Sequence, residues 1–176
     1  MGKNLEEHQS SYRYERKYLI PKSKQSDFLK NLFSAKFVEA YPLREINNIY
    51  FDDFHLKSFY ENEEGVSDRT KYRVRWYGKK FEKSKKFFEF KFKSEFLNRK
   101  KIIDMGSFGF KNPLESNVYY LNNLVRKITF KKEPGIELKP ILYNNYFRMY
   151  FYNQKLDVRI TIDYNLNYFS FLNKNL

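Results

Sequence analysis

The sequence predicts an α+β fold with a mainly antiparallel β-sheet of roughly six to eight strands and flanking helices. Its 176 residues suit one domain of ordinary size and leave too little chain for two. Polar and apolar residues alternate along several segments, as they do in strands that bury one face. In two other segments apolar residues recur at intervals of three and four, which is the spacing of amphipathic helices.

The N-terminal part contains one predicted strand and one predicted helix. Residues 1–11 are polar and carry charges of both signs, so we expect a disordered tail before a single domain over residues 12–176. Residues 12–20 alternate between charged odd positions and largely aromatic even positions, which predicts a strand. After Pro21 the helical spacing predicts a helix whose apolar stripe comprises Phe28, Leu29, Leu32 and Phe33.

The other predicted strands and a second helix follow along the chain. Alternation is clear in residues 71–78, 87–93, 146–152 and 157–163, and residues 46–53 and 99–104 predict two more strands. From Pro113 onward a second helix is predicted, with an apolar stripe of Val118, Leu121, Leu124, Val125 and Ile128. Trp76 and the strand phenylalanines are expected in the core, because large aromatic side chains dominate burial energetics.

The charged faces of the predicted strands are mainly positive. Their basic residues are Arg13, Lys17, Lys71, Arg73, Arg75, Lys91, Lys93, Arg148 and Arg159, and their acidic residues are Glu15, Glu89, Asp157 and Asp163. A solvated face is the simplest explanation for any single strand, but solvated faces usually mix the two signs more evenly. If the sheet closes with these faces inward, its lumen becomes a polyphosphate site in which cations bind phosphate oxygens and carboxylates hold a divalent metal.

Composition narrows the chemistry further. A net charge of +13, from 34 Lys and Arg against 21 Asp and Glu, points to a polyanionic partner such as nucleic acid, a phosphate chain or an acidic membrane surface. The absence of cysteine excludes disulfides, a thiolate nucleophile and cysteine-ligated metals, and two histidines cannot form a histidine-rich metal site. No apolar run suits a signal peptide or a membrane span, so we expect a cytoplasmic protein.

Six segments, in order along the chain, carry a family resemblance: RYERKYLI, IYFDD, KYRVRWYG, FFEFK, YFRMYF and VRITID. Together they resemble the catalytic domain of the vacuolar transporter chaperone (VTC) family, which belongs to the CYTH-like triphosphate tunnel metalloenzymes, over residues 12–166. The resemblance implies an antiparallel β-barrel whose tunnel binds tripolyphosphate or a nucleoside triphosphate. It also implies Mn²⁺ or Mg²⁺ as the cofactor, with ATP or polyphosphate as the partner.

The resemblance implies three sets of site residues. The catalytic residues would be Lys17, Arg73, Arg75 and Lys91. The other phosphate-binding residues would be Lys100, Tyr146, Arg148 and Arg159, where Lys100 is chosen over its neighbour Lys101 in the RKK segment. The metal ligands would be Glu15 and Glu89, with ion pairs to neighbouring cations as the alternative role of both. Asp52 and Asp53 could also serve a metal, but paired acids before a loop are commonly caps or turns.

Two departures from the family pattern affect these expectations. The broader superfamily opens with Glu-x-Glu-x-Lys, whereas this chain has Arg13 in place of the first glutamate. The family also continues with a Glu-x-Lys strand, which no segment after Asp163 resembles. We therefore expect either a tunnel domain that is incomplete at its C-terminus, without the closing strands, or a reduced site in which Glu15 and Glu89 serve the metal.

The expected function is that of a polyphosphate polymerase domain, which transfers the terminal phosphate of ATP to a polyphosphate chain. Tripolyphosphate hydrolysis and non-catalytic binding of polyphosphate or nucleotide are alternatives, because one phosphate grip can serve all three. Family context adds a membrane-protein partner. A single-stranded nucleic-acid binder is a further alternative, but strict alternation disfavours it because aromatic and basic residues fall on opposite strand faces. The charged face alone could still bind phosphate backbones non-specifically, and no specific nucleic acid is expected. Charge reversal at Arg73 or Arg75 is expected to abolish triphosphate binding with little loss of stability.

Overall fold

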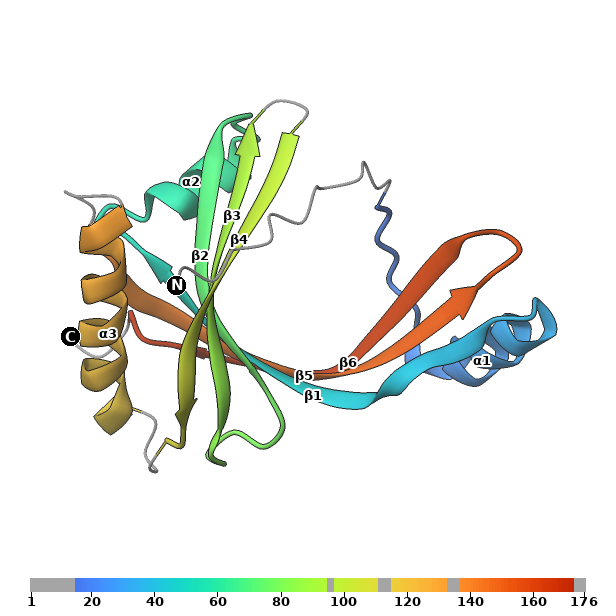
Figure 1. Cartoon of the computed structure of the whole chain (residues 1–176). Helices are drawn as coiled ribbons and strands as arrows, with labels where there is room; N and C mark the ends of the chain where they lie inside the picture. Colours follow the sequence, from blue (N-terminus) through green and yellow to red (C-terminus); the bar gives the residue numbers. More distant parts are fainter. Residues whose placement is uncertain (1–14, 95–96, 111–114, 133–136, 173–176) are drawn as a thin grey trace, which may run out of the picture.

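A computed structural model describes residues 15–94, 97–110, 115–132 and 137–172. Its six strands form one antiparallel sheet with the order β4-β3-β2-β1-β5-β6 (Figure 1). The strands are β1 (Val38–Asp52), β2 (Arg69–Tyr77), β3 (Ser84–Ser94), β4 (Leu97–Phe108), β5 (Lys139–Asn153) and β6 (Val158–Ser170). The helices are the 3-10 helix η1 (Lys22–Lys24) and the α-helices α1 (Gln25–Ser34), α2 (Lys57–Glu63) and α3 (Glu115–Lys132).

The predicted α+β class and the antiparallel sheet are confirmed, whereas a closed barrel is not. Within the described residues β4 and β6 are the two edges of the sheet and do not pair with each other. The sheet is strongly curved and twisted, and β2, β3 and β4 run steeply across β1, β5 and β6 near the end that carries α3 (Figure 1). The fold therefore presents an open concave face.

The prediction of a strand over residues 12–20 is wrong where it can be checked. Residues 15–20 have no regular secondary structure, and residues 12–14 lie outside the described part of the chain. Tyr18 and Leu19 are largely exposed to solvent, so these apolar side chains do not pack against the sheet. Alternation alone does not make a strand, because a strand also needs a neighbouring backbone that accepts its hydrogen bonds.

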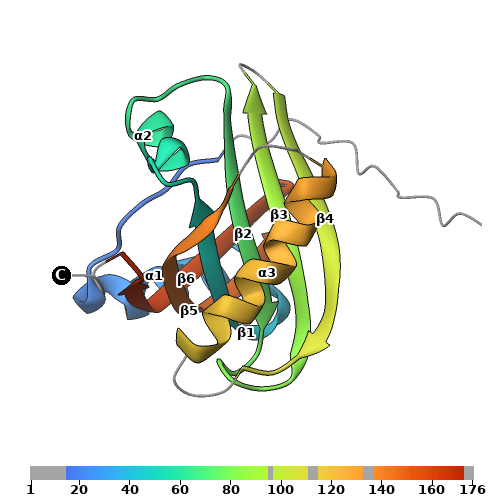
Figure 2. The ribbon, with the colours of Figure 1, turned by 90° about the vertical axis from the view of Figure 1, so that its left-hand side faces the viewer.

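Alternation divides the sheet into two chemically different faces. Val74 and Trp76 of β2 and Phe88 of β3 are fully buried, and they share a core cluster with Leu121 and Val125 of α3. Figure 2 shows α3 crossing the sheet on this convex side. The intervening residues of the same strands point to the concave face, since successive strand side chains alternate. The predicted apolar stripe of the second helix is confirmed at Leu121, Val125 and Ile128, whereas the side chain of Val118 lies outside the described part of the chain.

A second, smaller apolar cluster lies under α1. Leu32 of α1 packs with Phe37 and with Phe151 of β5, and Phe28 and Leu29 are partly buried against them. The apolar stripe predicted after Pro21 is therefore confirmed at these positions, while Phe33 is about half exposed. No helix in the described ranges is both long and apolar enough to cross a membrane.

Lys86 is fully buried on the convex side of β3. Its Nζ donates hydrogen bonds to Ser84 Oγ and to the Phe108 carbonyl, both at 2.8 Å, and lies 5.1 Å from the centroid of the Trp76 ring. Burial lowers the pKa of Lys86 to about 8. Carbonyl oxygens and aromatic rings thus hold the ammonium group, and their partial negative charge offsets part of the cost of burying it.

The buried Lys86 should make stability depend on pH. The unfolded chain holds this proton up to a pKa of about 10.4, whereas the folded chain releases it near pH 8. Between these values the unfolded state binds more protons, so the free energy of unfolding should rise by at most about 1.4 kcal/mol per pH unit. Chemical denaturation from pH 7.5 to about 9.5 should show this rise, and the Lys86→Met variant should show less of it. Equal slopes in the two proteins would contradict the assignment.

Candidate basic phosphate-binding face

Four predicted cationic residues lie together on the concave face. Strand register places Arg73 of β2 opposite Glu89 of β3, and Lys91 of β3 opposite Lys100 of β4. Arg75 lies two residues along β2 on the same face. We call Arg73, Arg75, Lys91 and Lys100, with Glu89 at their centre, the basic patch.

Glu89 is the buried anion around which the basic patch is built. Its side chain is 4% exposed, and its Oε2 accepts a 2.6 Å hydrogen bond from Arg73 Nε and a further contact from a terminal guanidinium nitrogen. Its Oε1 lies 3.1 Å from Lys100 Nζ. Burial alone would raise the pKa of Glu89, but the charges of Arg73, Arg75 and Lys100 hold that pKa below its usual value. Glu89 is therefore an ionised counterion at neutral pH.

Arg75 is held by amides instead of a carboxylate. It is 9% exposed, and its Nε donates a 2.8 Å hydrogen bond to Asn48 Oδ1 on β1. Asn48 in turn donates through Nδ2 to Asn144 Oδ1 on β5, at 2.7 Å. In the described part of the chain Arg75 forms no ion pair, so its charge is only partly neutralised, by the more distant Glu89.

Lys91 is a cation of the patch with a strongly lowered pKa. Its side chain is partly exposed, but the protein around it still reduces its hydration. This desolvation, followed by repulsion from Arg73, Arg75 and Lys100, lowers the pKa of Lys91 to about 8. An anion bound beside Lys91 would relieve the repulsion and restore its proton affinity.

Strand register separates Lys100 from its neighbour Lys101. Lys100 pairs with Lys91 and faces Glu89 on the concave side, while Lys101 pairs with the buried Phe90 and points to the opposite face. The choice of Lys100 over Lys101 is thus consistent with the position of the patch.

Tyr146 and Arg148 extend the concave face along β5. Arg148 forms two 2.6 Å hydrogen bonds with the carboxylate of Asp163 on β6, and its Cζ lies 5.3 Å from the centroid of the Tyr146 ring. These hydrogen bonds to Asp163 raise the pKa of Arg148 above its ordinary value. Arg159 lies farther along β6, exposed, with its Cζ 5.8 Å from the Tyr152 ring. Arg148 and Arg159 therefore share the face with the patch but lie outside its centre.

The structure does not bring Glu15 and Lys17 into the patch. Both belong to the irregular segment that replaces the predicted strand, with side chains 76% and 87% exposed, and the Lys17 Nζ lies 3.8 Å from Glu15 Oε1. Lys17 is near enough to Lys71 of β2 to lower the pKa of that lysine, after desolvation and Arg69. This segment therefore passes near one end of β2, and its predicted roles stay predictions.

The predicted metal ligands Glu15 and Glu89, as placed in the described part of the chain, do not fit a site for Mn²⁺ or Mg²⁺. Glu89 has both oxygens engaged by cations, and Glu15 is paired with Lys17 at the surface. Divalent cations of this kind require several oxygen ligands, and no group of three or more acidic or histidine side chains that could hold one occurs in the described ranges. Glu15 and Glu89 thus act as counterions of neighbouring cations.

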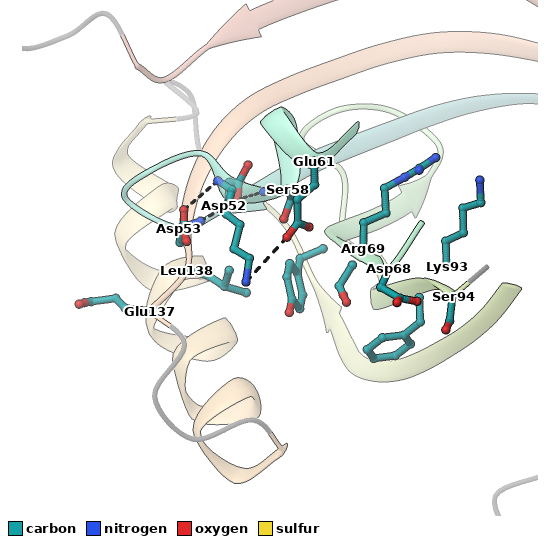
Figure 3. Close-up of a pocket in the computed structure, with 14 residues that line it drawn as sticks. Asp52, Asp53, Ser58, Glu61, Asp68, Arg69, Lys93, Ser94, Glu137 and Leu138 are labelled. Carbon is teal, nitrogen blue, oxygen red and sulfur yellow. Dashed lines mark hydrogen bonds and ion pairs between the residues drawn. The ribbon is translucent and has the colours of Figure 1, made fainter. Parts of the chain in front are cut away.

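A separate cavity of about 500 Å³ lies beside α2, and Figure 3 shows its lining. Asp52 Oδ1 accepts a 2.9 Å hydrogen bond from the backbone N–H of Ser58, and Asp53 Oδ1 accepts one of 3.0 Å from that of Lys57. These carboxylates therefore cap α2, in agreement with the role as caps considered for Asp52 and Asp53. The helix itself was not predicted from the sequence. None of the basic-patch residues lines this cavity.

Sequence reasoning missed several polar residues that support the patch. Asn48 and Asn144 could have been found, because both fall on the cationic face once strand parity is applied to their segments. Tyr77 and Tyr150 likewise continue the parity of Arg75 and Arg148. Arg44 also has the parity of Asn48 along β1, but it precedes the strand predicted over residues 46–53 and was therefore not considered.

Comparison with known proteins gives one family. The family model described as the VTC domain matches residues 12–175, which is most of the chain. No curated protein matches the chain. With the cationic strand faces gathered on one curved antiparallel sheet, this match shows that the chain belongs to the VTC domain family.

Proposed function

We propose that the basic patch binds the phosphate groups of ATP and polyphosphate, and that the domain transfers the terminal phosphate of ATP to a polyphosphate chain. The observation that carries this proposal is the excess of positive charge around Glu89. One buried carboxylate faces four cations, of which Arg75 and Lys91 have no carboxylate partner among the described residues. A bound polyanion would supply the missing negative charge.

The residues of the basic patch would contribute to phosphate binding in different ways. Arg75 is fixed through Asn48, so its guanidinium offers a preoriented planar fork for phosphate oxygens. Lys91 and Lys100 supply point charges on flexible stems, which can follow charge as it moves from one phosphate to the next. Phosphoryl transfer depends mainly on such positioning and charge neutralisation, so the mechanism needs no nucleophilic side chain.

A binding-only module is the second candidate. It is favoured by the ligands available for a metal, because the two predicted metal ligands, Glu15 and Glu89, are both engaged by cations. Tripolyphosphate hydrolysis would use the same grip with water as the acceptor. Product analysis separates the three: polymerisation lengthens polyphosphate and releases ADP, hydrolysis releases orthophosphate, and binding alone does neither.

Calorimetric titration with tripolyphosphate tests the proposal. We expect saturable binding to one site, much tighter than binding of orthophosphate, because several phosphates engage several cations at once. Titration with and without Mn²⁺ measures the metal dependence of that binding. Equal, weak and salt-sensitive binding of tripolyphosphate and orthophosphate would mean that the patch is a generic basic surface.

Lys91 predicts a pH dependence of binding. With its pKa at about 8, Lys91 in the free protein loses its positive charge as the pH rises through this value. A bound triphosphate favours the charged form, so affinity should fall and proton uptake on binding should increase from pH 7 towards pH 9. Calorimetry in buffers of different ionisation enthalpy measures the uptake. The Lys91→Gln variant provides the comparison, and an unchanged pH profile in this variant would contradict the assignment.

A further inference from the structure

A cluster of tyrosines surrounds one arginine beside the basic patch. The Cζ of Arg44 lies 5.2 Å from the ring centroid of Tyr41, 5.4 Å from that of Tyr77 and 5.5 Å from that of Tyr150. The rings of Tyr41 and Tyr150 also meet edge to face, with centroids 5.5 Å apart. We call Tyr41, Arg44, Tyr77 and Tyr150 the tyrosine cluster.

The tyrosine cluster lies on the same face as the basic patch. Tyr77 follows Arg75 at the next position of the same parity on β2, and Tyr150 follows Arg148 in the same way on β5. The charge of Arg75 also acts on the Tyr150 hydroxyl, which places the two groups within electrostatic reach. Aromatic and basic side chains therefore occur together on this half of the concave face.

Two features of this half of the concave face suit a ligand that carries both rings and phosphates. Tyr41 is 54% exposed and Tyr77 is 36% exposed, so parts of their rings are open to solvent. Farther along the face, Arg148 lies over Tyr146 and Arg159 lies over Tyr152, which repeats the pairing of a cation with a ring. Grooves that bind single strands combine cationic tracks for the backbone with aromatic rings on which bases stack.

We propose that the concave face binds single-stranded nucleic acid without sequence preference, with bases stacked on the tyrosine cluster and the backbone following the arginines towards the basic patch. The inference rests on the tyrosine cluster and not on the proposed phosphoryl transfer. Duplex bases are already stacked on one another, so their faces are not open to these rings, and the ligand is a single strand. The net charge of +13 adds long-range attraction for the same polyanion.

Fluorescence anisotropy with a labelled oligothymidylate of about ten nucleotides tests this inference. The comparison probe is an abasic oligonucleotide of the same length, which keeps the backbone charge and removes the bases. We expect the oligothymidylate to bind at least about 10-fold more tightly than the abasic strand, because each stacked base adds to the affinity. Equal affinity of the two strands would overturn the inference and leave a generic attraction for phosphates.

Variants locate the stacking site. Tyr41→Leu and Tyr77→Leu should each weaken oligothymidylate binding about 5-fold or more, with no change in affinity for the abasic strand. Tyr60→Leu is the matched control, because Tyr60 is also 54% exposed but lies on α2. If neither cluster variant differs from Tyr60→Leu, the cluster is not the stacking site and the inference is wrong. Thermal unfolding of all three variants checks that they fold.

The same variants separate this inference from the proposed function. Tyr41→Leu should bind tripolyphosphate as tightly as the parent chain, because tripolyphosphate has no base to stack. If the parent chain does not bind tripolyphosphate, only the proposed function is contradicted. Retained oligothymidylate binding in Tyr41→Leu and Tyr77→Leu would count against this inference alone.

Discussion

The Glu89→Gln variant is expected to lose about 3–5 kcal/mol of unfolding free energy. Glu89 is 3% exposed and is the carboxylate to which Arg73 and Lys100 are bound. Glutamine keeps nearly the same shape but removes the charge, so the cations of the basic patch then repel one another with no anion between them. Denaturant unfolding of the two proteins at one pH and one salt concentration measures the difference.

A surface carboxylate provides the control for this experiment. Asp104 of β4 also contacts a lysine, with 2.7 Å between its Oδ2 and Lys85 Nζ, but its side chain is 48% exposed. Asp104→Asn should therefore cost far less, since solvent screens surface ion pairs. Tripolyphosphate should raise the unfolding midpoint of Glu89→Gln more than that of the parent chain, because the ligand replaces the lost anion. Similar losses in the two variants would show that the buried position of Glu89 has no special role.

The Arg75→Gln variant is expected to bind tripolyphosphate about 10- to 100-fold more weakly while it stays folded. Arg75 offers charge to the concave face and is held by an amide, Asn48, whose hydrogen bond a glutamine can still provide in part. When Arg75 is replaced, the buried carboxylate of Glu89 keeps its direct contacts with Arg73 and Lys100. Titration calorimetry, together with thermal unfolding, measures both properties.

The control for Arg75 is an arginine on the other side of the molecule. Arg126 of α3 is about half exposed and lies 3.7 Å from Glu137, so Arg126→Gln changes the net charge by the same amount outside the patch. If both variants weaken binding equally, net charge and not the patch determines affinity. The sequence alone predicted that charge reversal at Arg73 or Arg75 would leave stability nearly unchanged. Because Arg73 is the direct partner of buried Glu89, little loss of stability is expected only for the neutral Arg75→Gln variant.

Most of the sheet could be predicted from sequence, because half-buried strands carry their own signal. Residues 71–78 and 87–93 match β2 and β3 closely, and residues 146–152 and 157–163 fall largely within β5 and β6. The exception at the start of β6 is Asp157, which lies in the turn before it with a φ of 49°. The helix α2 was missed because it has only seven residues and no buried residue, so it leaves no apolar stripe in the sequence.

The candidate site could be predicted in part, for a related reason. Parity along single strands places Arg73, Arg75 and Lys91 on one face, and the register of the sheet brings them together with Lys100. The ion pairs within that face depend on which strands are neighbours, and no single segment contains this information. The alternation rule also suggested that aromatic and basic groups separate, whereas Tyr146, Arg148 and Tyr150 share one parity on β5. The separation of aromatic and basic residues thus holds for Arg73 of β2 and Lys91 of β3, and fails at Tyr77 of β2 and along β5.

The division of the apolar core into two clusters has a consequence for the dynamics of the chain. The cluster under α3 is large, whereas the one under α1 is built on three buried residues, Leu32, Phe37 and Phe151. Segments that bury little apolar surface open at a lower free-energy cost than the molecule as a whole. The amides of α1 should therefore exchange with deuterium through local opening, while those of β2 and β3 should exchange only when the whole domain unfolds. The sheet would then have one rigid end, at the basic patch, and one end from which the covering helix α1 detaches often.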